Sequence, residues 1–507
     1  MFKRNVLANF FGKVWPSLLG LVLVPIYLRY LGIEAYGLIG FFVALQGLIT
    51  FLDLGLSTAS NREVARSSGD PDSSGDLGDL VRTFQVVYWG VAALIGTGFL
   101  LASNWLATEW IASQGIPAHV IRLAAIIFGI TLALRWPVAL YSGVLRGLER
   151  QVLLNLVSSV ITTVRNVGAA LMIVFVSQSI LLFLLWQLGA ALVEVLVMYL
   201  LTWRSLPRQP GRAPAFHFSI IQRVGRFGVS LTIISILASI FKQFDRVAIT
   251  KLLSLEAVGY YVAAYTVYEL LSYFVAPVVD AAFPRFSSLL SQGNMDALAD
   301  MYHNTAQIIS FLIAPATTFV FLFSYDILLI WTRSPDVAQN AHLTLSILAL
   351  AYGFNAMMHI PIMLQYAVGM TSIAMGVNVI GSIFLLPMMY VVIDRIGIPG
   401  AGITWLIFNL LYYLIAPHIM HRRILPGQKA RWIFRDTLSF LVLAWVLMGG
   451  AYAIASLFSN QLIVLGAVCI AGIIYLLACL LYYPSVQSVI PSFVTGRIAF
   501  NINRDAR

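Results

Sequence analysis

Two arginines and one lysine stand inside long apolar stretches in the first half of the chain: Lys13, Arg135 and Arg165. An ionisable side chain at membrane depth costs about 2.5–3.5 kcal/mol on insertion scales, so such residues usually face a cavity or a partner. Guanidinium groups bind phosphate through bidentate hydrogen bonds. We therefore predict that Arg135 and Arg165, together with Lys13, line a cationic cavity that binds an anion. The alternative is structural: the arginines pair with Glu194 or with backbone carbonyls.

A second group of charges, Lys242, Asp245 and Arg246, lies near one end of a later apolar segment. Lys242 and Arg246 stand at i and i+4 and share one face of a helix, with Asp245 close by. Such a group can be a local ion cluster whose long side chains reach the interface. The alternative is that these residues form an outer gate or contact the ligand there.

Three acidic residues within apolar segments, Asp53, Glu194 and Glu269, are candidates for coupling to an ion. A carboxyl group that is shielded from water can take up a proton, which suits such coupling. The alternative is that Glu194 or Glu269 is the internal partner of an arginine. Asp53 can instead pair with Arg62 or with another basic residue of the same loop.

The sequence lacks the common nucleotide and metal motifs. It contains no Gly-x-x-x-x-Gly-Lys-Ser/Thr loop for ATP and no His-Glu-x-x-His pair. The two cysteines, Cys469 and Cys479, share one apolar segment and match no zinc, redox or haem spacing. We therefore expect no metal, no cofactor and no catalytic residues.

The composition shows which environment must hold these residues. The chain has 507 residues, of which 60% are hydrophobic and 10% charged, and its mean hydropathy is +0.88. A soluble domain is about 45–50% apolar and about 25% charged, so an ordinary soluble enzyme is excluded. A disordered chain is also excluded, because disorder requires low hydrophobicity. We interpret the net charge of +10 as a sign of membrane topology rather than of nucleic-acid binding.

Fourteen apolar segments are long enough for transmembrane helices, which need about 20 mostly apolar residues. The sequence therefore predicts an all-α polytopic membrane protein. The predicted helices cover residues 9–30, 36–59, 82–103, 120–142, 153–176, 179–203, 227–250, 258–282, 304–325, 341–364, 371–393, 399–420, 437–458 and 462–483.

The basic residues orient these helices. With a cytoplasmic N-terminus, 21 of the 31 basic residues fall on the inner side, 6 on the outer side and 4 within helices. Positive charge is enriched in cytoplasmic loops, so this distribution favours cytoplasmic termini at both ends. All outer loops are short.

Two stretches of the sequence resemble each other at an offset of 222 residues. Both are predicted to be the outer turn between the first and second helix of a six-helix half. An even number of helices separates them, which predicts a parallel repeat about an axis along the membrane normal. In these stretches Leu31, Glu34, Ala35 and Gly37 match Leu253, Glu256, Ala257 and Gly259.

The repeat predicts two six-helix lobes that face each other across a central cavity opening to alternate sides. Two further helices then stand outside the repeat. The predicted parts are an N-lobe at 1–203, a basic cytoplasmic linker at 204–226, a C-lobe at 227–420, a basic cytoplasmic loop at 421–436, helices thirteen and fourteen at 437–483, and a cytoplasmic tail at 484–507.

The opening of the chain resembles a known family of membrane proteins. The residues that carry the resemblance are Tyr-Leu-Gly-Ile-Glu-Ala-Tyr-Gly-Leu at 30–38, Leu-Asp-Leu-Gly-Leu-Ser at 52–57 and Asn-Arg-Glu at 61–63. Weaker matches lie at 142–150, 255–261, 282–287 and 396–402. The chain is similar to the polysaccharide transport family, the Wzx-type flippases of the multidrug/oligosaccharidyl-lipid/polysaccharide (MOP) exporter superfamily.

The resemblance implies a function and a location. A member of this family moves an undecaprenyl-pyrophosphate-linked oligosaccharide from the inner to the outer leaflet of a bacterial plasma membrane, without covalent chemistry on the substrate. For such a substrate we predict that Arg135 and Arg165, together with Lys13, hold the pyrophosphate. Lys242, Asp245 and Arg246 are then either a local ion cluster or an outer gate or sugar contact. Membrane lipids, a polysaccharide polymerase and chain-length machinery are the expected partners, and nucleic acid is not.

Two other functions stay open at this point. The same fold could export a different substrate, such as a drug or lipid II. Cationic drugs require carboxylates in the cavity, whereas the first half of this chain offers arginines. A membrane-embedded glycosyltransferase or polymerase is disfavoured, because such enzymes usually carry their chemistry on a soluble domain or a long outer loop.

Overall fold

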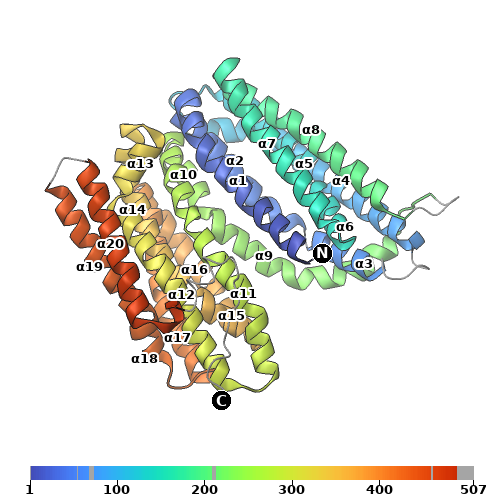
Figure 1. Cartoon of the computed structure of the whole chain (residues 1–507). Coiled ribbons are helices and arrows are strands. Elements are labelled where there is room, and N and C mark those ends of the chain that lie inside the picture. Colours follow the sequence, from blue (N-terminus) through green and yellow to red (C-terminus); the bar gives the residue numbers. More distant parts are fainter. Residues whose placement is uncertain (1, 54, 68–73, 208–212, 458–460, 488–507) are drawn as a thin grey trace. The chain divides into compact units, whose positions relative to one another are not determined.

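A computed structural model describes residues 2–53, 55–67, 74–207, 213–457 and 461–487. Side chains are described within these ranges except at 2–14, 16–17, 74–76, 223–238, 371, 373–375, 378 and 461–464. All elements in the described ranges are helices, without a strand (Figure 1). They form two compact units, Met1–Val262 and Ala263–Arg507.

The first unit contains the helices that surround the candidate site. They are α1 (Phe2–Leu31), α2 (Ile33–Ile49), η1 (Thr50–Asp53), α3 (Leu56–Ser67), α4 (Ser74–Trp105), the π-helix η3 (Leu106–Trp110), α5 (Ala118–Arg135), α6 (Val138–Gly147), α7 (Gln151–Phe175), α8 (Ile180–Ser205) and α9 (Phe218–Leu252). Helix α9 packs against α2 and α3, so this unit extends past the predicted linker at 204–226.

The second unit begins within α10 (Leu255–Leu270). Its other helices are α11 (Ser272–Ser291), α12 (Met295–Leu322), α13 (Ser324–Thr332), α14 (Pro335–Met357), α15 (His359–Ala367), α16 (Thr371–Ile396), α17 (Ile398–Arg423), α18 (Lys429–Arg431), the π-helix η4 (Trp432–Leu438), α19 (Ser439–Ser456) and α20 (Gln461–Tyr482).

The predicted all-helical membrane architecture is confirmed. Within the described residues, eleven helical stretches are long and apolar enough to cross a membrane, and α10 with α11, bent by 41°, gives a twelfth if the pair is one span. The two remaining predicted spans, 9–30 and 227–250, fall on α1 and α9, whose side chains are described only in part. The count of fourteen and the two-lobe repeat therefore stay predictions.

Two predicted spans of the first unit are broken rather than continuous. The span predicted at 120–142 consists of α5 and α6, with Pro137 between them. Proline lacks an N–H donor and clashes with the preceding turn, so the helical hydrogen bonds are interrupted there. The break places Arg135 at the last position of α5. The span predicted at 36–59 is divided among α2, η1 and α3, with Gly55 at φ 69° in the interruption.

The two repeated stretches touch each other through their glycines. A Cβ atom on Gly37 of α2 would lie 2.0 Å from the carbonyl oxygen of Leu255, and one on Gly259 of α10 would lie 2.4 Å from that of Ile33. Small residues let helix backbones approach this closely in membranes. The Leu255 amide also donates to the carbonyl oxygen of Ala112, at 3.0 Å. The first turns of α2 and α10 are thus joined by backbone contact within the first unit.

In the second unit the last two helices pack on α12. Helices α19 and α20 lie against each other (Figure 1) and bury Met448, Ala451 and Ala471. Tyr475 of α20 stacks on Phe311 of α12 with ring centroids 5.9 Å apart. Its hydroxyl donates to the Phe311 carbonyl oxygen at 3.1 Å. The C-terminal helix pair is therefore attached to the second unit through α12.

Candidate functional site

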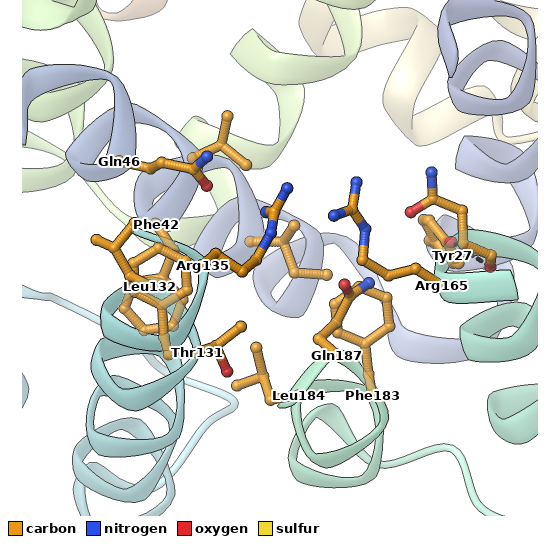
Figure 2. Close-up of a pocket in the computed structure, with 14 residues that line it drawn as sticks. Tyr27, Phe42, Gln46, Thr131, Leu132, Arg135, Arg165, Phe183, Leu184 and Gln187 are labelled. Carbon is orange, nitrogen blue, oxygen red and sulfur yellow. Dashed lines mark hydrogen bonds between the residues drawn. The ribbon is translucent and has the colours of Figure 1, made fainter. Parts of the chain in front are cut away.

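The first unit encloses a cavity of about 330 Å³ between helices α1, α2, α5, α7 and α8. Figure 2 shows the side chains that surround it. Two of the fourteen lining residues are arginines and none is acidic. The lining consists of Tyr27, Ile39, Phe42, Val43, Gln46, Phe128, Thr131, Leu132, Arg135, Arg165, Asn166, Phe183, Leu184 and Gln187.

Arg135 reaches the cavity from the end of α5. Because the helix stops before Pro137, the backbone N–H of Trp136 bonds back to Ala133 O at 3.3 Å, in a tighter turn. The Arg135 Nε donates to Oε2 of Glu194 on α8, at 2.9 Å. Helices α5 and α8 pack side by side, which brings these two residues into contact although 59 positions separate them.

Arg165 reaches the same cavity from the middle of α7. Its Nη1 donates to the same Oε2 of Glu194, at 3.3 Å. The backbone around it is also held: Trp186 Nε1 donates to the carbonyl oxygen of Arg165 at 3.1 Å, and the Tyr27 hydroxyl donates to that of Asn166 at 2.9 Å. Helices α1, α7 and α8 are thus tied together at the level of this arginine.

One carboxylate therefore serves two guanidinium groups. Glu194 is 8% exposed, and the side chains of Arg135 and Arg165 are 28% and 15% exposed. In Figure 2 both guanidinium groups point in the same direction. Two positive charges against one negative charge leave the cavity with a net positive charge. Both arrangements considered from the sequence are present, because the arginines line the cavity and also pair with Glu194.

The rest of the lining is aromatic or uncharged. Phe42 stacks on Phe128 at a centroid distance of 4.5 Å, and Tyr27 meets Phe183 edge to face at 5.4 Å. Uncharged hydrogen-bonding groups are supplied by Gln46, Thr131, Asn166 and Gln187. A cavity with this lining can bind an anion at the arginines and polar or ring-shaped groups beside them.

Lys13, the third basic residue predicted for the cavity, lies on α1. Its side chain is outside the described residues, so its role stays a prediction. The second predicted group lies on α9. There Lys242 is exposed, whereas Arg246 is buried and its Nη1 donates to Gln243 Oε1 at 2.9 Å. Asp245 is fully buried and accepts from the Tyr261 hydroxyl at 2.5 Å.

The remaining acidic candidates lie in different surroundings. Glu269 is exposed near the end of α10. Asp53 ends η1 and accepts a hydrogen bond from the Ser57 hydroxyl at 2.7 Å and another from the Tyr88 hydroxyl. The structure therefore brings Glu194 to the two arginines, gives Asp53 two hydroxyl partners and leaves Glu269 exposed.

Sequence reasoning missed a buried polar cluster in the second unit. Its centre is a contact between His303 on α12 and Asp436 on η4, both completely buried. Neither residue lies inside a predicted span, because His303 stands directly before the span at 304–325 and Asp436 directly before that at 437–458. The sequence offers one signal for such a pair: an ionisable residue stands directly before each of two distant apolar segments.

Comparison with known families gives two matches. A family model described as "Polysaccharide biosynthesis protein" matches residues 2–290, and one described as "MatE" matches residues 231–391. A protein of Shigella flexneri described as "Putative O-antigen transporter" is 24% identical over 415 residues, which cover 81% of this chain and 96% of that protein. These matches confirm the resemblance seen in the sequence.

Solved structures share the fold. The lipid II flippase MurJ, in an inward closed conformation, aligns over 96% of this chain and 99% of its own with a TM-score of 0.73 and 13% identity. An inward-facing multidrug resistance MATE family transporter of the MOP superfamily aligns over 81% of this chain and 94% of its own, with a TM-score of 0.64 and 15% identity. At these identities the likeness shows the fold alone.

Proposed function

The chain belongs to the polysaccharide biosynthesis protein family, whose model covers residues 2–290, and from this premise we propose that it is a lipid-linked oligosaccharide flippase. It moves a repeat unit carried on undecaprenyl pyrophosphate from the inner to the outer leaflet of a bacterial plasma membrane. Transport proceeds by alternating access and changes no covalent bond in the substrate. The product supplies surface polysaccharide biosynthesis.

The observation that carries this proposal is the shared contact of Arg135 and Arg165 with Glu194 Oε2. A guanidinium has five N–H donors, and Glu194 accepts from one on each arginine. Phosphate oxygens can form charge-assisted hydrogen bonds with the others. The pyrophosphate then binds beside Glu194 or displaces it, and the net positive charge of the cavity favours an anionic head group over a cationic drug.

The other lining residues suit the sugar next to the phosphate. Gln46, Thr131 and Gln187 can hydrogen-bond hydroxyl groups. The cavity volume of about 330 Å³ is at the low end of ligand pockets, which range over about 300–1,000 Å³. We therefore expect the cavity to hold the pyrophosphate and the neighbouring sugar, with the rest of the oligosaccharide outside it.

We also propose a membrane orientation and an energy source for the protein. Both termini lie in the cytoplasm, and the energy comes from an ion gradient, the membrane potential or removal of the product outside. Asp53 and Glu269 stay candidates for ion coupling. Lys242, Asp245 and Arg246 stay candidates for an outer gate or a sugar contact. A polymerase and chain-length machinery act on the product.

A leaflet assay tests the function. Purified protein is reconstituted with an undecaprenyl-pyrophosphate-linked oligosaccharide, and the fraction of glycan open to an added membrane-impermeant enzyme is followed over time. We expect faster exposure than in protein-free liposomes. R165A, incorporated to the same level, should lose this acceleration, and R122A, at an exposed position on α5, should keep it. A wild-type protein that exposes no glycan overturns the function, and a fully active R165A overturns the role of the cavity.

A second candidate substrate is lipid II, which also carries a pyrophosphate. The fold shared with the lipid II flippase over 96% of the chain is the observation that favours it. The same liposomes loaded with lipid II decide between the two. Faster movement of lipid II than of the oligosaccharide would favour this second candidate.

A further inference from the structure

A chain of hydrogen bonds joins four parts of the second unit: α12, η4, the segment between α17 and α18, and the segment that follows α20. Gln307 of α12 donates through Nε2 to Asp436 Oδ1 at 2.7 Å, and accepts at Oε1 from the Ser485 hydroxyl, at 2.5 Å. On the other side of Asp436, Oδ2 contacts Nδ1 of His303. The Nε2 of His303 lies 3.1 Å from Oε1 of Gln428, in the segment between α17 and α18. His303 and Asp436 are both completely buried.

Both ring nitrogens of His303 therefore face an oxygen acceptor. Nδ1 faces a carboxylate oxygen and Nε2 faces an amide oxygen. A neutral imidazole has one N–H donor and one bare acceptor nitrogen, whereas the imidazolium has two donors. The doubly protonated ring satisfies both contacts at once and forms an ion pair with the Asp436 carboxylate.

Burying the His303–Asp436 ion pair costs desolvation free energy that apolar packing of the same helices would avoid. Replacing a buried ion pair by apolar residues is often neutral or stabilising, so packing alone does not require one. Asp436 also stands in the π-helix η4, a form that is rare and often found at functional sites. Histidine is the side chain whose charge changes most readily near neutral pH. The location and chemistry of the pair point to proton binding.

We propose that His303 and Asp436 form a proton-binding site, with His303 carrying the proton in the arrangement described. The proton that leaves is the one on Nε2, because the Nδ1 proton is held by the carboxylate. It passes to water on the side of Gln428, whose side chain is half-buried. The bare Nε2 then faces an acceptor, so the Gln428 amide turns and presents its NH2 group. The site thus has two hydrogen-bonded states that differ by one proton.

Five titratable or charged groups of the described residues lie around His303 and its partners. The titratable or charged neighbours are Tyr302 on α12, Tyr413 and His421 on α17, Lys429 on α18 and Asp436 on η4. His421 Nδ1 lies 2.7 Å from the Pro417 carbonyl oxygen, and its Nε2 lies 3.2 Å from the Tyr302 hydroxyl. Those partners fit a neutral ring that donates at Nδ1 and accepts from tyrosine at Nε2.

Nitrogen-15 NMR of protein labelled at its seven histidines tests this proposal directly, since ring nitrogen shifts distinguish the charged ring from either neutral tautomer. H303Q identifies the resonances of His303. If H303Q does not fold, the signals that move in both D436N and Q428L identify them. H359Q, which removes a half-buried histidine on α15, is the matched control and should leave these signals in place.

We expect the wild-type ring to carry both protons in mildly acidic buffer and to lose one as pH rises. In D436N the doubly protonated ring should be absent in the same buffer, because the opposite charge has gone. A ring that is neutral from about pH 5 upward, or that keeps both protons until the protein unfolds, overturns the proposal. The measurement uses no substrate, so its outcome is independent of whether the protein moves a lipid-linked oligosaccharide.

Discussion

Arg135 and Arg165 donate to the same oxygen atom, Oε2 of Glu194, from two different helices, at 2.9 and 3.3 Å. The arginines come from α5 and α7 and the carboxylate from α8. The contact therefore fixes the distance between the two cations and joins three helices at one point. Any anion that enters the cavity meets this preformed pair.

Removing the Glu194 carboxylate should lower the stability of the protein without ligand and raise its affinity for anions. In E194Q the two guanidinium groups repel each other without a shared counterion, and breaking a buried pair costs about 3–5 kcal/mol. We expect a lower unfolding temperature than wild type in detergent and a larger rise on addition of inorganic pyrophosphate. E109Q, at an exposed position in η3, should match wild type. Equal pyrophosphate stabilisation of E194Q and wild type would contradict this prediction.

The positive charge and the planar shape of the two guanidinium groups should contribute separately to the affinity for the pyrophosphate. Lysine keeps the charge but loses the planar fork, and alanine loses both. One charge-assisted hydrogen bond contributes about 1.5–3 kcal/mol, which corresponds to about 10–150-fold in affinity. We expect binding of the pyrophosphate-linked lipid, measured by displacement of a labelled analogue, to fall from wild type to R165K to R165A. Indistinguishable lysine and wild-type affinities would argue for a simple charge effect.

The contact of α2 with α10 should not tolerate a side chain. A Cβ at Gly37 would overlap the Leu255 carbonyl oxygen, so G37V must push the helices apart, and G259V has the same effect from the other side. Overpacking of this kind costs about 1–3 kcal/mol or more. Thermal unfolding in detergent measures the loss. G90A is the control, since a Cβ at Gly90 meets nothing within 4 Å. A G37V protein as stable as G90A would show that the contact is dispensable.

The rate of flipping should depend on pH through His303. If its proton is exchanged in each transport cycle, the wild-type rate in liposomes changes between about pH 5 and about pH 8. H303Q cannot exchange that proton, so its rate should be flat over this range, and H359Q should follow wild type. The pH profile, rather than the rate at one pH, is the readout, because a purely structural defect lowers the rate equally at every pH. If the rate of H303Q changes with pH in the same way as that of wild type, proton binding at His303 is not part of the transport cycle.

The sequence predicts the helices well because hydropathy reports the lipid environment directly. The predicted span at 153–176 corresponds to α7 (Gln151–Phe175), and that at 399–420 to α17 (Ile398–Arg423). The interruption after Arg135 was not predicted, because Pro137 is equally compatible with a kinked continuous helix. Whether a proline bends or ends a helix depends on the packing around it.

Side-chain contacts between distant positions are harder to predict. The sequence identified Arg135, Arg165 and Glu194, because charge is rare in an apolar segment and needs a partner nearby. It did not identify His303 and Asp436, which lie 133 positions apart and meet only through the packing of η4 on α12. On α9, helical spacing placed Lys242 and Arg246 on one face, yet one is exposed and the other is buried.

The shared oxygen of Glu194 is also a template for an inhibitor. An anionic oxygen of a bisphosphonate, like one of a pyrophosphate, can take the place of Glu194 Oε2 between the two guanidinium groups. A methylene-bridged bisphosphonate on a short prenyl chain cannot be hydrolysed and carries no sugar to be released at the far side. Such a compound would compete with Glu194 for both arginines and arrest the protein with its cavity filled.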